Sequence, residues 1–416
     1  MPADFVTELR QAFSGAYNEP PAVVVRAPGR VNLIGEHTDY SHLPVLPIAI
    51  DRALYIAAAP SAEPVVEVRS AQFEPSAVLT RDGPARRETG WHGYVAGVLN
   101  ELRDVASGRG ARVFITGDLP PASGLSSSSA LSVGLMAALN GAWEGGLEAP
   151  IIAHRAAAAE RHVGVETGGM DQTVITFAVP GAALRIDFEP FAIRPVPLPE
   201  GLAVVVASSG EDAPKGGAAR DAYNERVVGA RLAAAMLSEQ IGFEPGNPPR
   251  LRDVWGADAV EILVDDLPEK ISVREVTRSV GIDAGVLARF DSGAIDTALR
   301  VPTRRPARHI LSEADRVEAA EAALTDGDIE AFGRLLNESH ESLRNDFKCS
   351  TPALDKVCAA MRRAGALGAR LTGAGFGGFA VAVARPEQVD AIIEAATKAT
   401  GGPAFEVRAS AGLEFL

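Results

Sequence analysis

The sequence of 416 residues has little of what several protein classes require. Its two cysteines, Cys349 and Cys358, are too few for a disulfide framework, which is typical of a reducing compartment. No uncharged apolar run reaches the roughly 18 residues of a membrane span. The N-terminus mixes acids into its apolar positions, unlike a signal or transit peptide. We therefore expect a cytoplasmic protein that does not bind a membrane.

Basic stretches are also scarce. The 54 acidic and 40 basic residues give a net charge of −14, and no Lys/Arg-rich run of the kind that binds nucleic acid occurs. Apolar residues make up 47% and charged residues 23%, which is typical of a globular protein, and the length indicates two domains. These properties predict a globular enzyme without a nucleic-acid partner. We further expect small-molecule substrates and a monomer or weak oligomer.

Helical and strand patterns alternate irregularly along the chain. Helices are expected at 4–17, 90–101, 131–143, 151–162, 218–241, 307–324 and 328–345, and strands at 22–25, 45–50, 54–58, 65–68, 113–115, 183–188, 202–207, 369–372 and 379–384. Without a regular βαβ alternation, this mixture favours the α+β class. We expect an N-terminal domain over 1–195 and a C-terminal domain over 196–416, with a helical insertion around 243–306.

A serine-rich stretch, Pro-Pro-Ala-Ser-Gly-Leu-Ser-Ser-Ser-Ser-Ala at 120–130, lies between a predicted strand and a predicted helix. Helix N-termini bind anions, Gly124 allows close approach of a phosphate, and hydroxyls can donate to phosphate or bind Mg²⁺. A polar linker with a serine cap is the alternative, although one serine would suffice for a cap. No Walker A pattern occurs, so a nucleotide triphosphate would be held by amides, hydroxyls and Mg²⁺.

A glycine-rich stretch at 373–378 formally matches G-x-G-x-x-G. A dinucleotide site requires a helix after the glycines, but the strand-like run Phe379–Ala384 follows. A tight hairpin remains possible. Four glycines in six residues instead indicate close backbone approach to a bound molecule.

Polar residues also cluster between the first two predicted strands, where Arg30, Asn32, Glu36, His37 and Asp39 fall within ten positions. A solvated loop would explain any one of them. Together they favour a site for a polyhydroxylated ligand.

A lone aspartate follows two glycines in Gly168-Gly169-Met170-Asp171, just after the helix that carries Glu160. Aspartate after glycine is often a turn or cap residue. Spacing alone does not separate that role from a functional one.

Together these stretches resemble the GHMP kinase superfamily and, within it, the galactokinase family. Residues 29–40 resemble the galactokinase signature, 121–130 the ATP-phosphate loop and 371–378 the third, glycine-rich motif, with further matches at 168–172, 223–226 and 308–317. The resemblance covers nearly the whole chain. It implies two domains with the active site in the cleft between them. It also implies transfer from ATP, with Mg²⁺, to the anomeric hydroxyl of galactose, giving galactose 1-phosphate and ADP.

The resemblance further implies roles for individual residues. Asp171 would be the catalytic carboxylate with Arg30 as its partner, and Ser128 and Glu160 would hold Mg²⁺. The implied sugar contacts are Glu36, His37, Asp39, Gly168 and Tyr223, and the implied nucleotide contacts are Gly124, Leu125, Ser126, Ser127, Ser128 and Ser129. The chemistry agrees, because a carboxylate can take a hydroxyl proton and an arginine keeps that carboxylate ionised and offsets phosphoryl charge.

Other functions remain open. Galactokinases commonly continue the signature as Asp-Tyr-Asn-x-Gly, whereas Ser41-His42-Leu43-Pro44 follows Tyr40 here. Parts of 120–130 and 160–171 look closer to N-acetylgalactosamine kinases, so that sugar, or a related hexose, is an alternative to galactose. A non-catalytic galactose and ATP sensor is disfavoured because the serine-rich loop is intact. A mevalonate-type kinase would have no reason to carry residues 36–40.

Overall fold

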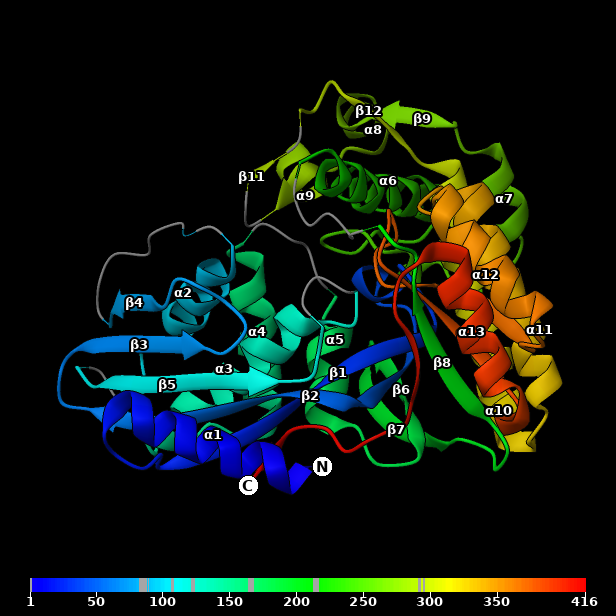
Figure 1. Ribbon diagram of the computed structural model, residues 1–416. Helices are drawn as coiled ribbons and strands as arrows, with labels where there is room; N and C mark the ends of the chain where they lie inside the picture. Colours follow the sequence, from blue (N-terminus) through cyan, green and yellow to red (C-terminus); the bar gives the residue numbers. More distant parts are fainter. Residues whose placement is uncertain are drawn as a thin grey trace. The chain divides into compact units, whose positions relative to one another are not determined.

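The protein is described by a computed structural model over residues 2–81, 88, 90–105, 108–120, 124–163, 168–211, 217–290, 293–294 and 296–416 (Figure 1). Residues 121–123 of the predicted phosphate loop lie outside these ranges. The helices are α1 (Pro2–Tyr17), α2 (Trp91–Glu101), α3 (Ser127–Ala142), α4 (Ala149–Arg161), α5 (Met170–Phe177), α6 (Gly217–Ile241), α7 (Val260–Asp266), α8 (Val273–Val280), α9 (Ala284–Ala288), α10 (Arg304–Asp326), α11 (Ile329–Ser342), α12 (Pro352–Arg363) and α13 (Val389–Thr400). Single turns are η1 (Asp39–Ser41), η2 (Leu251–Asp253), η4 (Pro386–Gln388) and the π-helical η3 (Leu343–Phe347).

The strands are β1 (Val23–Ile34), β2 (Leu46–Ser61), β3 (Val65–Ser70), β4 (Ala77–Thr80), β5 (Gly110–Gly117), β6 (Ala182–Phe188), β7 (Phe191–Pro197), β8 (Ala203–Ser208), β9 (Lys270–Ser272), β10 (Arg289–Phe290), β11 (Gly293–Ala294), β12 (Arg300–Pro302), β13 (Gly368–Thr372), β14 (Phe379–Ala384), β15 (Ala404–Val407) and β16 (Glu414–Phe415). This mixture of helices and sheets confirms the α+β class. Among the described residues, no helix is both long enough and apolar enough to cross a membrane.

The chain forms two compact units, and each is discontinuous in sequence. The first unit comprises Met1–Arg30, Ile48–Ala182 and Arg408–Leu416, and the second comprises Val31–Pro47 and Ala183–Val407. The single boundary near residue 195 expected for the two family domains stays a prediction.

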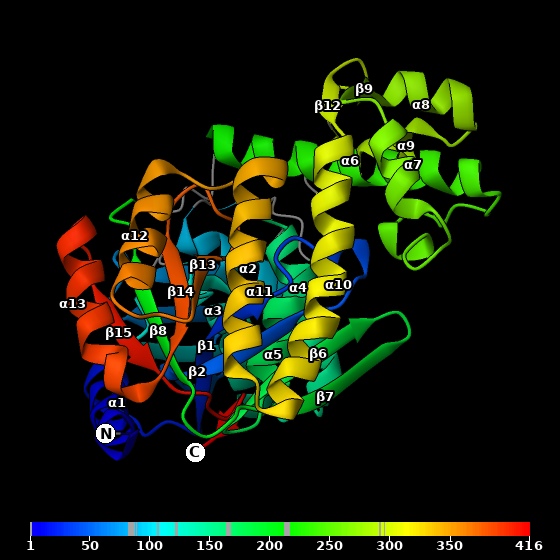
Figure 2. The ribbon, with the colours of Figure 1, turned by 90° about the vertical axis from the view of Figure 1, so that its right-hand side faces the viewer.

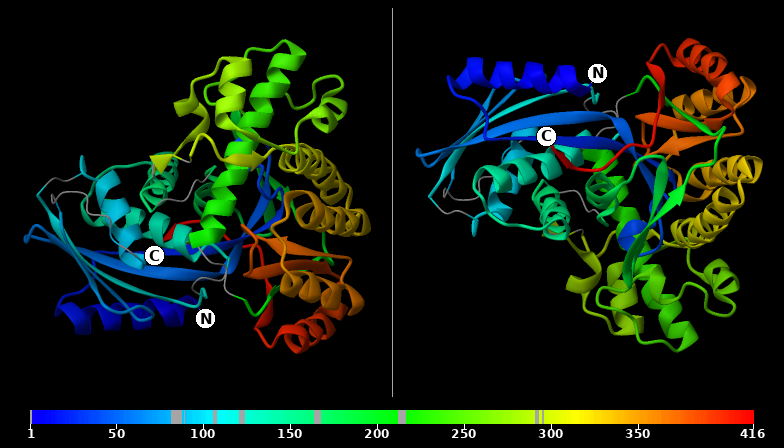
Figure 3. Two further views of the ribbon diagram at one scale, coloured as in Figure 1. Left: turned by 90° about the horizontal axis from the view of Figure 1, so that it is seen from above. Right: turned by 90° about the horizontal axis from the view of Figure 1, so that it is seen from below.

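The first unit is built on a sheet with strand order β16-β1-β2-β5-β3-β4, in which β3 and β5 are parallel. Helix α1 covers one face and α2–α5 the other (Figures 1 and 3). Leu9 and Phe13 of α1 pack on Tyr55 and Ala57 of β2. Since both faces are covered, β2 is almost continuously apolar and buried rather than alternating.

The second unit contains the antiparallel sheet β13-β14-β8-β15. Helices α12 and α13 pack on this sheet and α11 on β13, and Figure 2 shows α10–α13 as one layer of long helices. Residues 243–303 lie between α6 and α10, and those that the structure describes form three short helices, α7–α9, together with two two-stranded sheets, β12-β9 and β10-β11. Their apolar side chains share a core with α6 and α10. Residues 304–306 of the expected insertion already belong to α10.

The polar cluster near the N-terminus was expected in a loop, and the structure corrects part of this expectation. Strand β1 continues through it to Ile34, so Arg30 and Asn32 lie on a strand and only the residues after Ile34 form the loop. Pro28 and Gly29 predicted a break. A glycine suits position 29, because a β-carbon there would lie 2.4 Å from Leu119 Cδ1 and 2.9 Å from the Leu125 carbonyl oxygen.

Candidate active site

A bidentate ion pair joins Asp171 and Arg30 in the first unit. Arg30 Nε donates to Asp171 Oδ1 at 2.6 Å, and Nη2 donates to Oδ2 at 2.7 Å. Arg30 Nη1 also donates to the Gly124 carbonyl at 2.7 Å, and Arg30 is only 6% exposed. The two residues predicted as a catalytic pair, 141 positions apart, are therefore neighbours, and the guanidinium has a fixed orientation.

The serine-rich loop reaches the same carboxylate. Ser126 has a left-handed backbone (φ +58°) and donates its hydroxyl proton to Asp171 Oδ2, and Ser129 Oγ lies 3.4 Å from the same oxygen. Ser126 is the N-cap residue of α3, but its side chain makes no capping hydrogen bond to the helix. The Leu125 side chain is fully buried, and its carbonyl accepts the Arg30 N–H at 3.1 Å. Leu125 could therefore serve a nucleotide only through its backbone.

Ser128 and Glu160, the predicted metal residues, lie around one phenol in the first unit. The Ser128 side chain hydrogen-bonds to Tyr94, and burial together with the charge of Glu160 raises the pKa of Tyr94. Glu160 is 8% exposed and accepts a hydrogen bond from Gln172 Nε2 at 2.5 Å. Mg²⁺ in phosphoryl-transfer sites takes one or two carboxylates together with phosphates and water. A hydroxyl and one carboxylate therefore fit Mg²⁺ that arrives with a triphosphate.

The signature residues after Ile34 form a tight loop in the second unit. Gly35 (φ +101°) and His37 (φ +65°) are both left-handed, and a β-carbon on Gly35 would lie 2.9 Å from the Cα of Val45. Thr38 Oγ1 bonds to the carbonyls of Gly35 at 2.9 Å and Pro44 at 2.8 Å. The threonine hydroxyl thus closes the loop.

The Glu36 carboxylate joins this loop to the glycine-rich motif. Its Oε1 accepts the Gly373 N–H at 2.7 Å and the Thr372 hydroxyl at 3.2 Å, and lies 3.2 Å from Arg370 Nη2. Two stretches that the sequence singled out separately therefore meet within the second unit. Glu36 was predicted to contact the sugar. The sugar contact stays a prediction. In addition, Glu36 has a structural role, because it bonds to Gly373 and Thr372.

Aromatic rings surround His37 in the second unit. Its ring stacks on Phe347 with centroids 3.9 Å apart, and the centroid of Tyr223 lies 5.7 Å away. Burial lowers the pKa of His37, so the imidazole is neutral. Among the residues that the structure describes, His37 Nε2, the Tyr40 hydroxyl and both side-chain polar atoms of Asn32 are buried without a hydrogen-bond partner. Because unsatisfied buried polar groups are costly, such atoms are suited to the hydroxyls of a bound ligand.

The remaining predicted sugar contacts fall in different units. Asp39 begins the turn η1 and belongs to the second unit with Glu36, His37 and Tyr223, whereas Gly168 precedes α5 in the first unit. The structure brings the first four to one unit and leaves the role of Gly168 a prediction.

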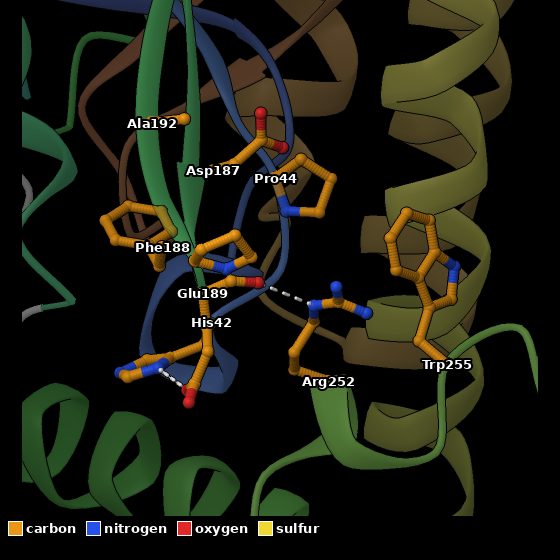
Figure 4. Close-up of a pocket in the computed structure, with 9 residues that line it drawn as sticks. His42, Pro44, Asp187, Phe188, Glu189, Ala192, Arg252 and Trp255 are labelled. Carbon is orange, nitrogen blue, oxygen red and sulfur yellow. Dashed lines mark hydrogen bonds and ion pairs between the residues drawn. The ribbon is translucent and has the colours of Figure 1, made fainter.

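The departure from the galactokinase signature at Ser41–Pro44 is anchored within the second unit. His42 Nδ1 bonds to the Glu189 carboxylate at 2.9 Å, and Leu43 is fully buried in the core of α6 and α10. Figure 4 shows His42 and Arg252 meeting at Glu189 beside Trp255, around a cavity of about 180 Å³. The altered signature residues thus have a packing role of their own.

Two buried side chains of α10 contact the backbone of the signature loop. Glu313 Oε1 accepts the Gly35 N–H at 3.0 Å, and His309 Nε2 lies 3.1 Å from the Glu36 carbonyl oxygen. Burial would raise the pKa of the Glu313 carboxyl, but the charges of Arg316 and Arg370 and the hydrogen bond from Ser339 lower it below its ordinary value. Burial lowers the pKa of His309 from 6.5 to about 4. Near neutral pH, Glu313 is therefore ionised and His309 is neutral.

Stability is expected to fall as the pH drops from about 6.5 towards 4. The unfolded chain binds a proton at His309 in this range while the folded protein does not, so the free energy of unfolding decreases by up to about 1.4 kcal/mol per pH unit for this residue. Urea unfolding followed by circular dichroism at pH 5 and pH 7 measures the slope. His309→Gln should show a shallower slope. Part of the slope should remain in this variant, because the pKa of His340 is also lowered to about 4. An unchanged slope in His309→Gln would contradict the assignment.

Comparison with known families agrees with this geometry. The family model described as the galactokinase galactose-binding signature matches residues 11–60, the GHMP kinases N terminal domain matches 93–178, and the GHMP kinases C terminal model matches 319–401. A galactokinase of Roseiflexus sp. strain RS-1 is 38% identical over 98% of this chain and 96% of its own. The chain belongs to the galactokinase family.

Other members of the galactokinase family and its superfamily are similar over nearly their full lengths. A galactokinase of Streptomyces coelicolor is 34% identical, covering 97% of this chain and 96% of its own. The crystal structure of Lactococcus lactis galactokinase complexed with galactose matches with a TM-score of 0.79 and 25% identity, covering 99% of this chain and all of that one. A mevalonate kinase from L. major shares the fold, with a TM-score of 0.58 and 19% identity.

Sequence reasoning missed two residues of the site in this galactokinase-family chain. Gln172 beside Asp171 and Tyr94 of α2 contact the predicted metal residues. Tyr94 could have been found, because it lies on a helix face that the sequence pattern predicts. Nothing local in the sequence identifies Gln172 as the partner of Glu160.

Proposed function

We propose that this chain transfers the γ-phosphoryl group of ATP to the anomeric hydroxyl of galactose, giving galactose 1-phosphate and ADP. The observation that carries the proposal is the Asp171–Arg30 ion pair, held by the serine-rich loop at the start of α3. Full-length similarity to galactokinases, including one crystallised with galactose, supports the choice of sugar.

The roles of the residues follow from their contacts. Asp171 accepts the proton of the attacking hydroxyl, and Arg30 orients this carboxylate and stabilises charge on the transferring phosphoryl group. The N–H groups of the first turn of α3 bind phosphate oxygens, and Gly124 (φ +78°) leaves the backbone open to close approach. Bound through Ser128 and Glu160, Mg²⁺ would offset phosphate charge.

The sugar is recognised in this proposal by the signature loop. A site built to hydrogen-bond hydroxyls rejects analogues that leave its polar atoms unpaired, by up to ~10⁴–10⁵ in specificity. His37 Nε2 and the Tyr40 hydroxyl are such atoms. N-acetylgalactosamine is the second candidate, because the chain departs from the galactokinase signature at Ser41–Pro44.

A panel of galactose, N-acetylgalactosamine, glucose, mannose, arabinose and galacturonate tests the proposal, with ADP release as the readout. We expect the highest kcat/KM for galactose and little turnover of glucose. A kcat/KM for N-acetylgalactosamine at least about tenfold above that for galactose would replace galactose as the substrate. Sugar binding without ADP release from any sugar would favour the sensor.

Ser128→Ala is expected to raise the KM for ATP·Mg²⁺ by about tenfold, because a hydroxyl that binds the metal is lost. Ser127→Ala is the matched control in the same first turn, and should stay within about twofold of the wild type. Titration of ATP at fixed excess Mg²⁺ gives both values. Equal effects of the two changes would remove Ser128 from the metal site.

We further propose that the protein works in the cytoplasm as a monomer or weak oligomer, without nucleic-acid or membrane partners. Cys349 and Cys358 are both free thiols, and burial raises the pKa of each to about 12, which suits a reducing compartment.

A further inference from the structure

The backbone of the signature loop is held by α10 at two successive residues. Glu313 accepts the N–H of Gly35 at 3.0 Å, and His309 contacts the carbonyl of Glu36 at 3.1 Å. The loop needs such support, because Gly35 and His37 have left-handed backbones that no strand pairing fixes.

Both side chains are themselves locked in place. Glu313 Oε1 also accepts the Ser339 hydroxyl at 2.6 Å, and Oε2 pairs with Arg316 Nε at 2.7 Å. His309 Nδ1 lies 2.9 Å from the Ser342 hydroxyl. Because a carbonyl oxygen only accepts hydrogen bonds, His309 carries its proton on Nε2, and Ser342 donates to Nδ1. Glu313 and His309 are both fully buried.

The residue that follows these two anchored peptides is His37. Its ring lies against Phe347, and its Nε2 has no hydrogen-bond partner within the described part of the chain. A small rotation of the backbone at Gly35 or Glu36 would therefore move the ring away from its present direction. Misplacement by about 1 Å is enough to weaken a preorganised site strongly.

We propose that Glu313 and His309 are positioning residues for sugar binding, which hold the loop from Gly35 to His37 in its binding conformation without touching either substrate. The inference rests on the proposed sugar kinase function and adds to it two residues outside the signature. We call Glu313 and His309, together with their contacts to Gly35 and Glu36, the clamp. The nucleotide residues of the serine-rich loop belong to the first unit, whereas the clamp belongs to the second. Its loss should therefore change the KM for the sugar and leave that for ATP unchanged, which a general loss of stability would not do.

Four variants and one control test the proposal. His309→Ala and Glu313→Ala each remove one loop contact. His309→Gln places an amide N–H where Nε2 lies, and Glu313→Gln keeps an acceptor for the Gly35 N–H. Asp315→Asn removes a charge from the same helix but affects only the bond with Trp255 Nε1 at 2.8 Å. Initial rates with varied sugar and varied ATP give both KM values for each protein.

We expect both alanine variants to raise the KM for the sugar about tenfold or more, with the KM for ATP within about twofold. The glutamine variants should recover most of the loss, and Asp315→Asn should match the wild type. Sugar and ATP KM values that rise together, or a sugar KM that stays unchanged, would overturn the proposal. If Glu313→Ala does not fold, the His309 pair decides alone. Rates are measured with the sugar that the wild type uses best, so a wild type inactive on galactose contradicts the proposed substrate and leaves the test of the clamp intact.

Discussion

Asp171→Asn is expected to lower kcat by about 10²–10⁴-fold, the usual contribution of a general base. The amide keeps the shape of the carboxylate but cannot accept the hydroxyl proton, and it loses the bidentate pair with Arg30. Because the side chain remains at the same place, the KM for ATP should change far less than kcat. Steady-state rates with galactose and ATP, on protein whose folding is verified by circular dichroism, measure both.

A surface pair that is also bidentate, although through the two Nη atoms of its arginine, provides the control for this change. Asp104 also forms a bidentate pair with an arginine, at 2.5 and 2.8 Å from Arg155, but its side chain is 64% exposed. Asp104→Asn should leave kcat unchanged. If folded Asp171→Asn retained near-normal turnover, Asp171 would have no part in proton transfer.

The stretches that carry chemistry could be predicted because their signals are local. A serine-rich turn before an apolar helix and a glycine-rich turn between two strands each fit within about a dozen residues, and strands β13 and β14 occur where those patterns place them. Helix α3 begins at Ser127, before the expected start at 131, so Ser127–Ser129 lie in its first turn and not in a preceding loop. The resemblance also named Asp171 and Arg30 together, and the structure shows them in contact.

What could not be predicted depends on contacts between distant residues. Glu36 was chosen as a sugar contact from its place in the signature, but its bond to the Gly373 N–H spans 337 positions. Glu313 and Gly35 are 278 positions apart. The periodicity of apolar residues indicates which side chains of a helix or strand face the core. It contains no information about which buried charge contacts which backbone amide. The extension of β1 to Ile34 was missed for a related reason, because Pro28 and Gly29 favour a break that tertiary packing overrides.

Several charged side chains of the second unit are buried, among them Glu36, Glu313 and Arg370. Arg370 of β13 is fully buried. It donates to the Leu33 carbonyl at 2.9 Å and pairs with the Glu36 carboxylate of the signature loop. Its charge also contributes to the lowered pKa values of Glu313 and His37. One arginine therefore stabilises two carboxylates, Glu36 of the signature loop and Glu313 of α10.

Arg370→Met should lower the free energy of unfolding by about 3–5 kcal/mol, because removing one partner leaves a buried charge uncompensated. Methionine fills most of the space of the arginine stem, so the loss reflects charge more than an empty volume. Glu36 would keep the hydrogen bonds from Gly373 and Thr372, but these do not replace a full positive charge. Urea unfolding at pH 7, followed by circular dichroism, gives the difference from the wild type.

Arg385 offers the matched control, since it pairs with Glu330 in the same unit with both side chains nearly half exposed. An exposed pair contributes about 0–1 kcal/mol, so Arg385→Met should be close to the wild type. Equal destabilisation by the two changes would mean that the Arg370–Glu36 pair is no more important than a surface contact. If Arg370→Met lowers the free energy of unfolding and Arg385→Met does not, the charge of Arg370 contributes to the stability of the second unit as well as to that of the signature loop. Its substitution should then impair sugar binding and stability together, whereas loss of the Glu313 or His309 contact should mainly impair sugar binding.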